Sequence, residues 1–207
     1  MGKIVCLMGK SSSGKDTIYK KLLEQETVTL RAIIPYTTRP IRAGERDGVE
    51  YHFTDEEGFR KLLAQGCVIE DREYNTCMGM WRYFTVADGE VDLLQHSYVI
   101  IGTLEAYMQM RRFYGENKVL PVMIELDDGE RLQRALDREK TQDHPKYEEM
   151  CRRFLADAED FSEENLKRAG IDRTFYNDEV DECLKKIVEY LQESLTDSDE
   201  EVTKCGY

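Results

Sequence analysis

The chain has 207 residues, enough to bury a full hydrophobic core as one domain with subdomains or as two small domains. Acidic residues outnumber basic ones by 42 to 29, and the net charge of −13 argues against a nucleic acid or an anionic membrane as partner. Six cysteines lack metal-like spacing, no apolar signal segment opens the chain, and no apolar stretch approaches the roughly 18 residues of a membrane span; we therefore expect a cytoplasmic protein with reduced thiols.

Short apolar runs alternate with amphipathic stretches, a pattern typical of an α/β protein with a largely parallel sheet. The apolar runs are predicted as core strands, at residues 4–8, 98–101, 119–126 and 174–176. The amphipathic stretches are predicted as helices, at residues 17–23, 104–113, 130–140, 147–168 and 180–195. Residues 196–207 are acidic and have no apolar period, so we expect a disordered, solvated tail there.

The middle of the chain has a different character. Thr54 followed by Glu57 resembles a capping box that opens a helix, and Gly66 is placed to end it. Two further stretches alternate as strands of an antiparallel sheet with one wet face do, and we expect a small α+β domain inserted into a parallel-sheet core. The strands are expected at 68–74 and 80–86, the insertion at about 37–90, and the core at about 1–36 and 91–195.

A phosphate-binding loop is predicted between the first strand and the first helix. Two glycines bracket a small-residue turn, so successive backbone N–H groups can point at one anion, and the helix adds its positive dipole end. The run matches G-x-x-x-x-G-K-[ST], except that Asp16 takes the last place and the hydroxyl follows at Thr17. A glycine-rich turn that binds nothing is the alternative. The loop residues are Gly9, Lys10, Ser11, Ser12, Ser13, Gly14, Lys15, Asp16 and Thr17.

A second motif opens the inserted region, at residues 37–53. It resembles guanylate kinase, whose monophosphate site carries the pattern T-R-x-x-R-x-G-E-x-x-G-x-x-Y-x-F, and the resemblance extends over residues 3–195. Arg39 and Arg42 can fork onto the oxygens of a monoester phosphate, and Tyr51 can donate a phenolic hydrogen bond. A chance basic loop is the alternative.

The resemblance also implies a pocket for the base. Glu70 aligns with the carboxylate that reads guanine, and the chemistry fits, because guanine offers a ring N–H and an amino group side by side. Tyr83 and Thr85 resemble the tyrosine and hydroxyl that complete the monophosphate pocket. A surface ion pair is the alternative for Glu70, and simple strand packing is the alternative for Tyr83 and Thr85.

In the second half, the resemblance implies a helical lid at about 138–153, with Arg138 and Arg153 closing on the transferring phosphoryl group. Either arginine could instead be a solvated helix residue. Asn177 resembles the asparagine beside the adenine of ATP. The three histidines show no ligand spacing.

Two departures from the family pattern bear on magnesium and on guanine. Pro35 stands where many guanylate kinases have a guanine-contacting serine, and residues 99–104 lack the acidic residues usual there. We therefore propose Asp16 and Thr17 as Mg²⁺ ligands, Asp16 directly or through water. The alternative for Asp16 is a favourable interaction with the helix dipole.

The sequence is thus identified as a member of the guanylate kinase family, with a three-layer P-loop NTPase-type core. The resemblance implies transfer of the γ-phosphoryl group of ATP to GMP or dGMP, with Mg²⁺ as cofactor. Two alternatives stay open: a kinase for another nucleoside monophosphate, or an inactive module that binds protein partners, which the retained Lys15 argues against. The predicted catalytic residues are Lys15, Arg39, Arg138 and Arg153.

Overall fold

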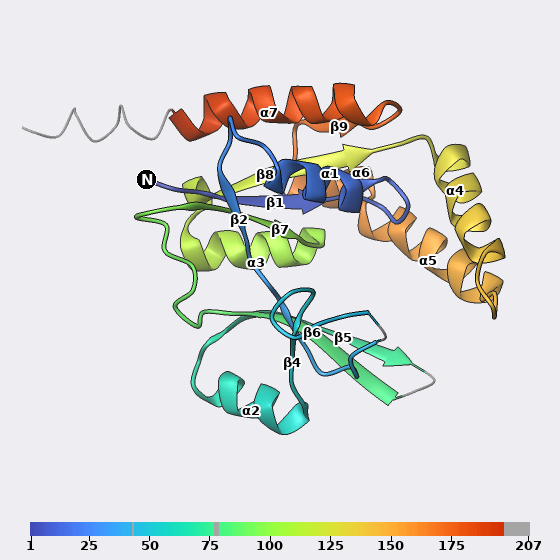
Figure 1. The fold of residues 1–207 in the computed structure, drawn as a ribbon, viewed down its shortest axis with the longest axis horizontal. Coiled ribbons are helices and arrows are strands. Elements are labelled where there is room, and N and C mark those ends of the chain that lie inside the picture. The colour runs from blue at the N-terminus through green and yellow to red at the C-terminus, as the bar shows by residue number, and fades with distance from the viewer. Residues whose placement is uncertain (43, 77–78, 197–207) are drawn as a thin grey trace, which may run out of the picture.

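A computed structural model of the chain describes residues 1–42, 44–76 and 79–196 (Figure 1). The tail predicted for 196–207 lies outside the described residues except for Thr196, which ends the last helix. No helix in the described ranges is long and apolar enough to cross a membrane.

The core is a five-stranded parallel sheet with the strand order β2-β7-β1-β8-β9. All four predicted core strands are present within a residue of their expected ends. The sequence pattern missed β2, which has three residues, two of them exposed, and therefore no apolar run. The strands are β1 Ile4–Met8, β2 Leu30–Ala32, β7 Ser97–Ile101, β8 Val119–Glu125 and β9 Thr174–Tyr176.

Side chains of the central strand β1 alternate between two buried clusters, because successive residues of a strand point to opposite faces of the sheet. Ile4, Cys6 and Met8 pack with α3 (Leu104–Tyr114) and α6 (Glu163–Arg168). Val5 and Leu7 pack with α1 (Lys15–Leu23) and α7 (Val180–Thr196) on the other face. Figure 1 shows α7 and α3 on opposite sides of the sheet. The three-layer α/β prediction is confirmed.

A second sheet comes from the chain between β2 and β7, in the strand order β4-β3-β6-β5. Its pairs are antiparallel except for β3 and β4, and Phe59, Phe84 and Val86 form a small core beneath it. Ile69 of β5 joins the main core beside α3. The elements are β3 Tyr36–Thr37, β4 His52–Phe53, α2 Glu56–Ala64, β5 Val68–Thr76 and β6 Gly79–Val86.

The helix predicted at 147–168 is broken into α5 (Tyr147–Asp160) and α6. Phe161 leaves the helical conformation and packs into the core cluster beside α3. The amide of Asn165 donates to the carbonyls of Glu159 and Asp160, which satisfies the end of α5. The remaining helices are α4 Asp128–Lys140 and the short 3₁₀ turn η1 Glu116–Lys118.

The capping prediction for α2 is wrong by one residue. The carboxylate of Asp55, not Thr54, caps the helix and accepts the Gly58 N–H at 2.8 Å. Glu57 pairs with Lys61 one turn further on, so it does not close a capping box. Aspartate competes well for this position because its oxygens accept N–H bonds strongly. The chain turns out of the helix at Gly66, whose φ is 71°, so the prediction that it ends α2 is confirmed.

Replacing Asp55 with Ala removes the acceptor of the Gly58 N–H, and we expect the free energy of unfolding to fall by about 1 kcal/mol. Thr54→Ala is the matched control, because it leaves the cap in place. Urea titration of both variants measures the difference. A larger loss for Thr54→Ala would mean that the threonine carries the cap after all.

Candidate active site

The predicted phosphate loop joins β1 to α1, and its backbone takes a positive φ at three residues, the first of them Gly9 with a φ of 156°. Ser12 has a φ of 63° and Gly14, at the N-cap of α1, a φ of 85°. A side chain at Gly14 would be strained, and its Cβ would also lie 2.3 Å from Nδ2 of Asn177. Glycine is therefore required at this position, and the conformation of the loop depends on a residue far along the chain.

Asn177 follows β9 and is fully buried against the loop. Its side-chain amide donates to the carbonyl of Ser13 at 2.7 Å, and its backbone N–H donates to the carbonyl of Glu125 at 2.8 Å. The sequence predicts a contact between Asn177 and adenine. In this structure its partner is the loop itself, so we assign it a bracing contact, and the base contact stays a prediction.

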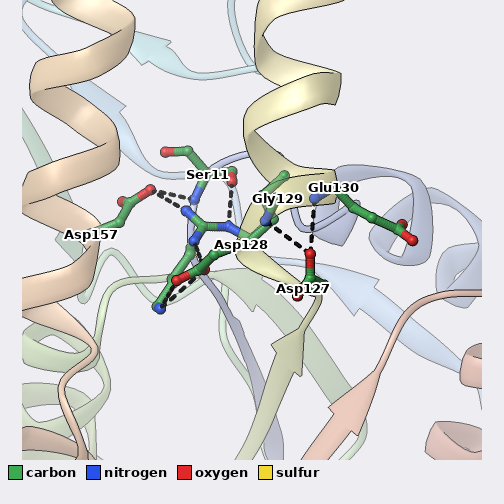
Figure 2. Close-up of polar contacts among 8 residues, drawn as sticks. Ser11, Asp127, Asp128, Gly129, Glu130 and Asp157 are labelled. Carbon is green, nitrogen blue, oxygen red and sulfur yellow. Dashed lines mark hydrogen bonds and ion pairs between the residues drawn. The ribbon is translucent and has the colours of Figure 1, made fainter.

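A cluster of charged side chains, centred on the buried Arg131, also contacts the loop (Figure 2). Arg131 of α4, only 1% exposed, donates from Nε to the carbonyl of Ser11 at 3.0 Å and from Nη2 to Asp157 of α5 at 3.1 Å. Asp157 also accepts the Ser11 N–H at 2.6 Å. Arg131 further binds Asp128, which lies 3.3 Å from Nζ of Lys10. Both backbone polar groups of Ser11 are thus held by α4 and α5.

Asp127 fixes the start of α4, the helix that carries Arg131. Its carboxylate caps α4 by accepting the N–H groups of Gly129 and Glu130, at 2.9 and 3.1 Å (Figure 2). Because β8 ends at Glu125, the cap begins α4 almost directly after the sheet and points Arg131 at the loop. Neither Arg131 nor Asp157 was predicted from the sequence. Arg131 forms an ordinary-looking helical pair with Asp128, three residues before it, and its pairing with Asp157 on another helix depends on the fold.

Three of the predicted phosphate-binding cations are without partners. Among the described residues, no hydrogen bond or ion pair engages the side chains of Lys15, Arg138 or Arg153. Burial lowers the pKa of Lys15, the charges of Asp16 and Asp157 oppose that shift, and the charge of Arg153 adds to it. Lys15 and Arg153 therefore lie within electrostatic range of each other. These cations keep their donors for a ligand.

The two arginines of the motif differ in burial and in their partners, which the sequence did not predict. The fork of Arg39, 3% exposed, is bound at both ends by Glu45, with N–O distances of 2.7 and 2.6 Å. These bonds lower the pKa of Glu45 to about 2. The guanidinium lies 5.0 Å from the Tyr51 ring centroid. Among the guanidinium nitrogens of Arg39, Nε has no partner in the described part of the chain. The side chain of Arg42 is exposed, and no described residue forms a hydrogen bond or ion pair with it. Both phosphate contacts stay predictions.

The predicted base-reading residues lie together on the β5–β6 hairpin. Glu70 and Thr85 are opposite each other, and the Thr85 hydroxyl donates to Oε1 of Glu70 at 2.7 Å. Tyr83 is the next residue on the same face of β6 and lies edge-on to Tyr51, with ring centroids 5.6 Å apart. Burial first, and the Glu70 charge second, raise the pKa of the Cys6 thiol on β1 to about 12. Glu70 therefore lies within electrostatic range of the central strand of the core.

A family model described as Guanylate kinase matches residues 1–194. The chain belongs to the guanylate kinase family. A guanylate kinase of Wolbachia pipientis wMel is 31% identical over 190 residues, 90% of this chain and 87% of that protein. One of Chlorobaculum tepidum is 31% identical over 137 residues, 65% of this chain and 67% of that protein. The crystal structure of guanylate kinase from Anaplasma phagocytophilum has the same fold, with a TM-score of 0.64 and 23% identity over 94% of this chain and 86% of that chain.

In this member of the guanylate kinase family, we expect the replacement of Arg131 to lower the stability of the fold. Arg131→Met leaves Asp157 and the Ser11 carbonyl without their buried partner, and we expect the free energy of unfolding to fall by about 3 to 5 kcal/mol. Arg152→Met is the control, because Arg152 pairs with Glu149 on the exposed side of α5, and its change should stay below about 1 kcal/mol. Urea unfolding compares the two. Similar losses would show that the cluster is no stronger than a surface pair.

Proposed function

We propose that this protein transfers the γ-phosphoryl group of ATP to GMP or dGMP, giving ADP and the corresponding diphosphate. The observation that carries the proposal is the presence of two candidate anion sites on separate units of one fold. One is the loop after β1 with Lys15, and the other is the arginine motif of the second sheet, with Glu70 beside it. Membership of the guanylate kinase family supports the same reaction.

Phosphoryl transfer asks little covalent chemistry of a protein, so catalysis rests on alignment and on neutralising the charge of the transferring group. The loop N–H groups and Lys15 would hold the β- and γ-phosphates, and Arg138 and Arg153 would neutralise the charge between the two substrates. Their lack of protein partners supports this division, because an unpaired cation gives up no ion pair when it binds phosphate.

On the acceptor side, Arg42 and Tyr51 would bind the monophosphate directly. Arg39 would contribute mainly its charge and its free Nε, since Glu45 holds the fork and sets its orientation. Glu70, with Thr85 and Tyr83 beside it, would read the base. Approach of the two units would exclude water, which otherwise would hydrolyse ATP.

Guanylate kinases are generally Mg²⁺-dependent, and Asp16 and Thr17 fit a role in holding the ion. Both side chains are exposed in the first turn of α1, no hydrogen bond engages either of them within the described ranges, and both offer hard oxygen ligands. The described residues contain no group of three or more His, Cys, Asp or Glu able to hold a metal. Bound magnesium would supply charge neutralisation at the phosphates, with the nucleotide and water completing its ligands.

A coupled ADP-release assay against a panel of nucleoside monophosphates tests the function. We expect GMP or dGMP to be the preferred acceptor, and Glu70→Gln to reduce GMP turnover by about 10-fold or more, because a donor replaces an acceptor in the pocket. The KM for ATP should barely change. Preference for AMP, CMP or UMP would support a different monophosphate kinase, and no turnover at all would favour a binding module.

The arginines should separate by kinetic role. Arg42→Ala and Arg39→Ala should raise the KM for GMP, since they remove ground-state binding, whereas Arg138→Ala and Arg153→Ala should mainly lower kcat. Arg152→Ala is the matched control, because this neighbour of Arg153 is already paired with Glu149. Steady-state kinetics measure both parameters. Unchanged kcat in the Arg138 and Arg153 variants would remove both residues from the proposed lid.

Asp16 provides a test of metal handling. If its carboxylate helps to hold Mg²⁺, Asp16→Ala should need several-fold more Mg²⁺ for half-maximal activity, while the melting temperature hardly changes. The helix-dipole alternative predicts only a stability loss of about 0.3 to 1 kcal/mol. Titrating MgCl₂ at constant free ATP separates the two. A normal magnesium dependence would mean that Asp16 is only a residue of the first helical turn.

A further inference from the structure

Arg72 lies in the candidate base pocket, although nothing in the sequence motifs pointed to it. It is two residues after Glu70 on β5, so both side chains lie on the same face of the hairpin. Glu70 is opposite Thr85 and Arg72 is opposite Tyr83, which places four side chains in one patch. The side chain of Arg72 is 19% exposed and that of Glu70 only 1%. Arg72 is therefore the more accessible of the two partners, and the carboxylate beside it is buried.

The hydrogen bonds of this patch leave a specific set of groups unused. Arg72 donates to Glu70 from Nε at 3.1 Å and from Nη2 at 3.5 Å, and Thr85 adds its hydroxyl to Oε1. No other hydrogen bond of the Arg72 side chain is formed among the described residues. A guanidinium carries a further pair of N–H donors on Nη1, and a carboxylate accepts up to about four bonds. An open donor thus lies beside a carboxylate with remaining acceptor capacity.

We propose that Arg72 is a specificity-determining residue of the acceptor site, donating from Nη1 to the O6 oxygen of guanine while Glu70 accepts from N1–H and the 2-amino group. The inference rests on the proposed function and deepens it. Guanine presents one acceptor and two donors along this edge, which matches the donor of Arg72 and the acceptors of Glu70. Arginine is the side chain that most often recognises the acceptors O6 and N7 of guanine.

The same arrangement disfavours the other purine. Adenine has an amino group in place of O6 and an unprotonated N1, so its donor would face Arg72 and its acceptor would face Glu70. Neither base contact would form, and each polar group of the base would face a group of the same kind, donor to donor and acceptor to acceptor, which costs more than a missing contact at a surface. Of the other residues in the patch, Thr85 already donates its hydroxyl to Glu70. The free donor of Arg72 is therefore placed to discriminate at position 6 of the purine.

Three acceptor substrates, GMP, IMP and 2-aminopurine riboside monophosphate, distinguish a contact at O6 from a contact at the 2-amino group. IMP keeps O6 and N1–H but lacks the 2-amino group, whereas 2-aminopurine riboside monophosphate keeps the amino group and lacks both O6 and N1–H. Arg72→Met is compared with Arg60→Met, a control on α2 whose side chain is exposed and paired with Glu56. The ADP-release assay gives kcat/KM for all three acceptors, and thermal unfolding checks the fold of each variant.

We expect Arg72→Met to lower kcat/KM for GMP and IMP alike, by about 10- to 100-fold, and to leave the 2-aminopurine substrate nearly unchanged. The Arg60 variant should match the wild type. Unchanged GMP kinetics, or a collapsed ratio of GMP to IMP, would overturn the proposal, because the second result means that Arg72 only orients Glu70 toward the amino group.

A second variant covers the case in which Arg72→Met does not fold. Arg72→Lys keeps a positive charge beside Glu70 but lacks the fork, so GMP and IMP should again fall together, by a smaller factor. Wild-type kinetics for both acceptors in Arg72→Lys would overturn the proposal. Failure of the wild-type protein to phosphorylate GMP would instead overturn the proposed function, so the two failures are distinguishable.

Discussion

An anion-binding loop presents backbone N–H groups that cannot swing toward a ligand, so its shape has to be set by the residues packed behind it. Here the support comes from two distant parts of the chain. Asn177, after β9, donates to the carbonyl of Ser13. Arg131 and Asp157, on α4 and α5, hold the carbonyl and the N–H of Ser11. The loop is thus bound by the residue that follows strand β9 and by the two outer helices α4 and α5.

Arg131 and Asp157 each share a helix with one of the two exposed arginines of the predicted lid. Arg138 follows Arg131 by about two helical turns on the same face of α4, and Arg153 precedes Asp157 by about one turn on the same face of α5. Because Asp157 binds the loop, Arg153 lies one helical turn from that attachment, within electrostatic range of Lys15. The electrostatic coupling of Arg153 to Lys15 agrees with this arrangement.

The core strands and the long helices were predictable from the sequence because each carries its own period of apolar residues. The breaks were not: Phe161 interrupts α5 and α6 through a contact with distant α3, and Asp55 displaces Thr54 as the cap through a difference of one residue in local geometry. In the site, motif spacing identified the loop, and the family resemblance identified Glu70 and Thr85, which the structure shows to be hydrogen-bonded. It could not reveal which cations are neutralised, because the partners Glu45 and Asp157 are chosen by the fold.

That division of the cations explains how a chain with a net charge of −13 can bind anionic nucleotides. Buried and half-buried arginines are paired with carboxylates and shape the site, since an unpaired charge would be costly in the interior. The cations that have no partner among the described residues are less buried, retain their donors, and would supply a local positive charge that the net charge conceals. The paired set is Arg39, Arg72 and Arg131, and the unpaired set is Lys15, Arg42, Arg138 and Arg153. Arg72 belongs to both descriptions, because its partner leaves one end of its guanidinium free, and this is why a residue that stabilises a buried carboxylate is also placed to recognise a base.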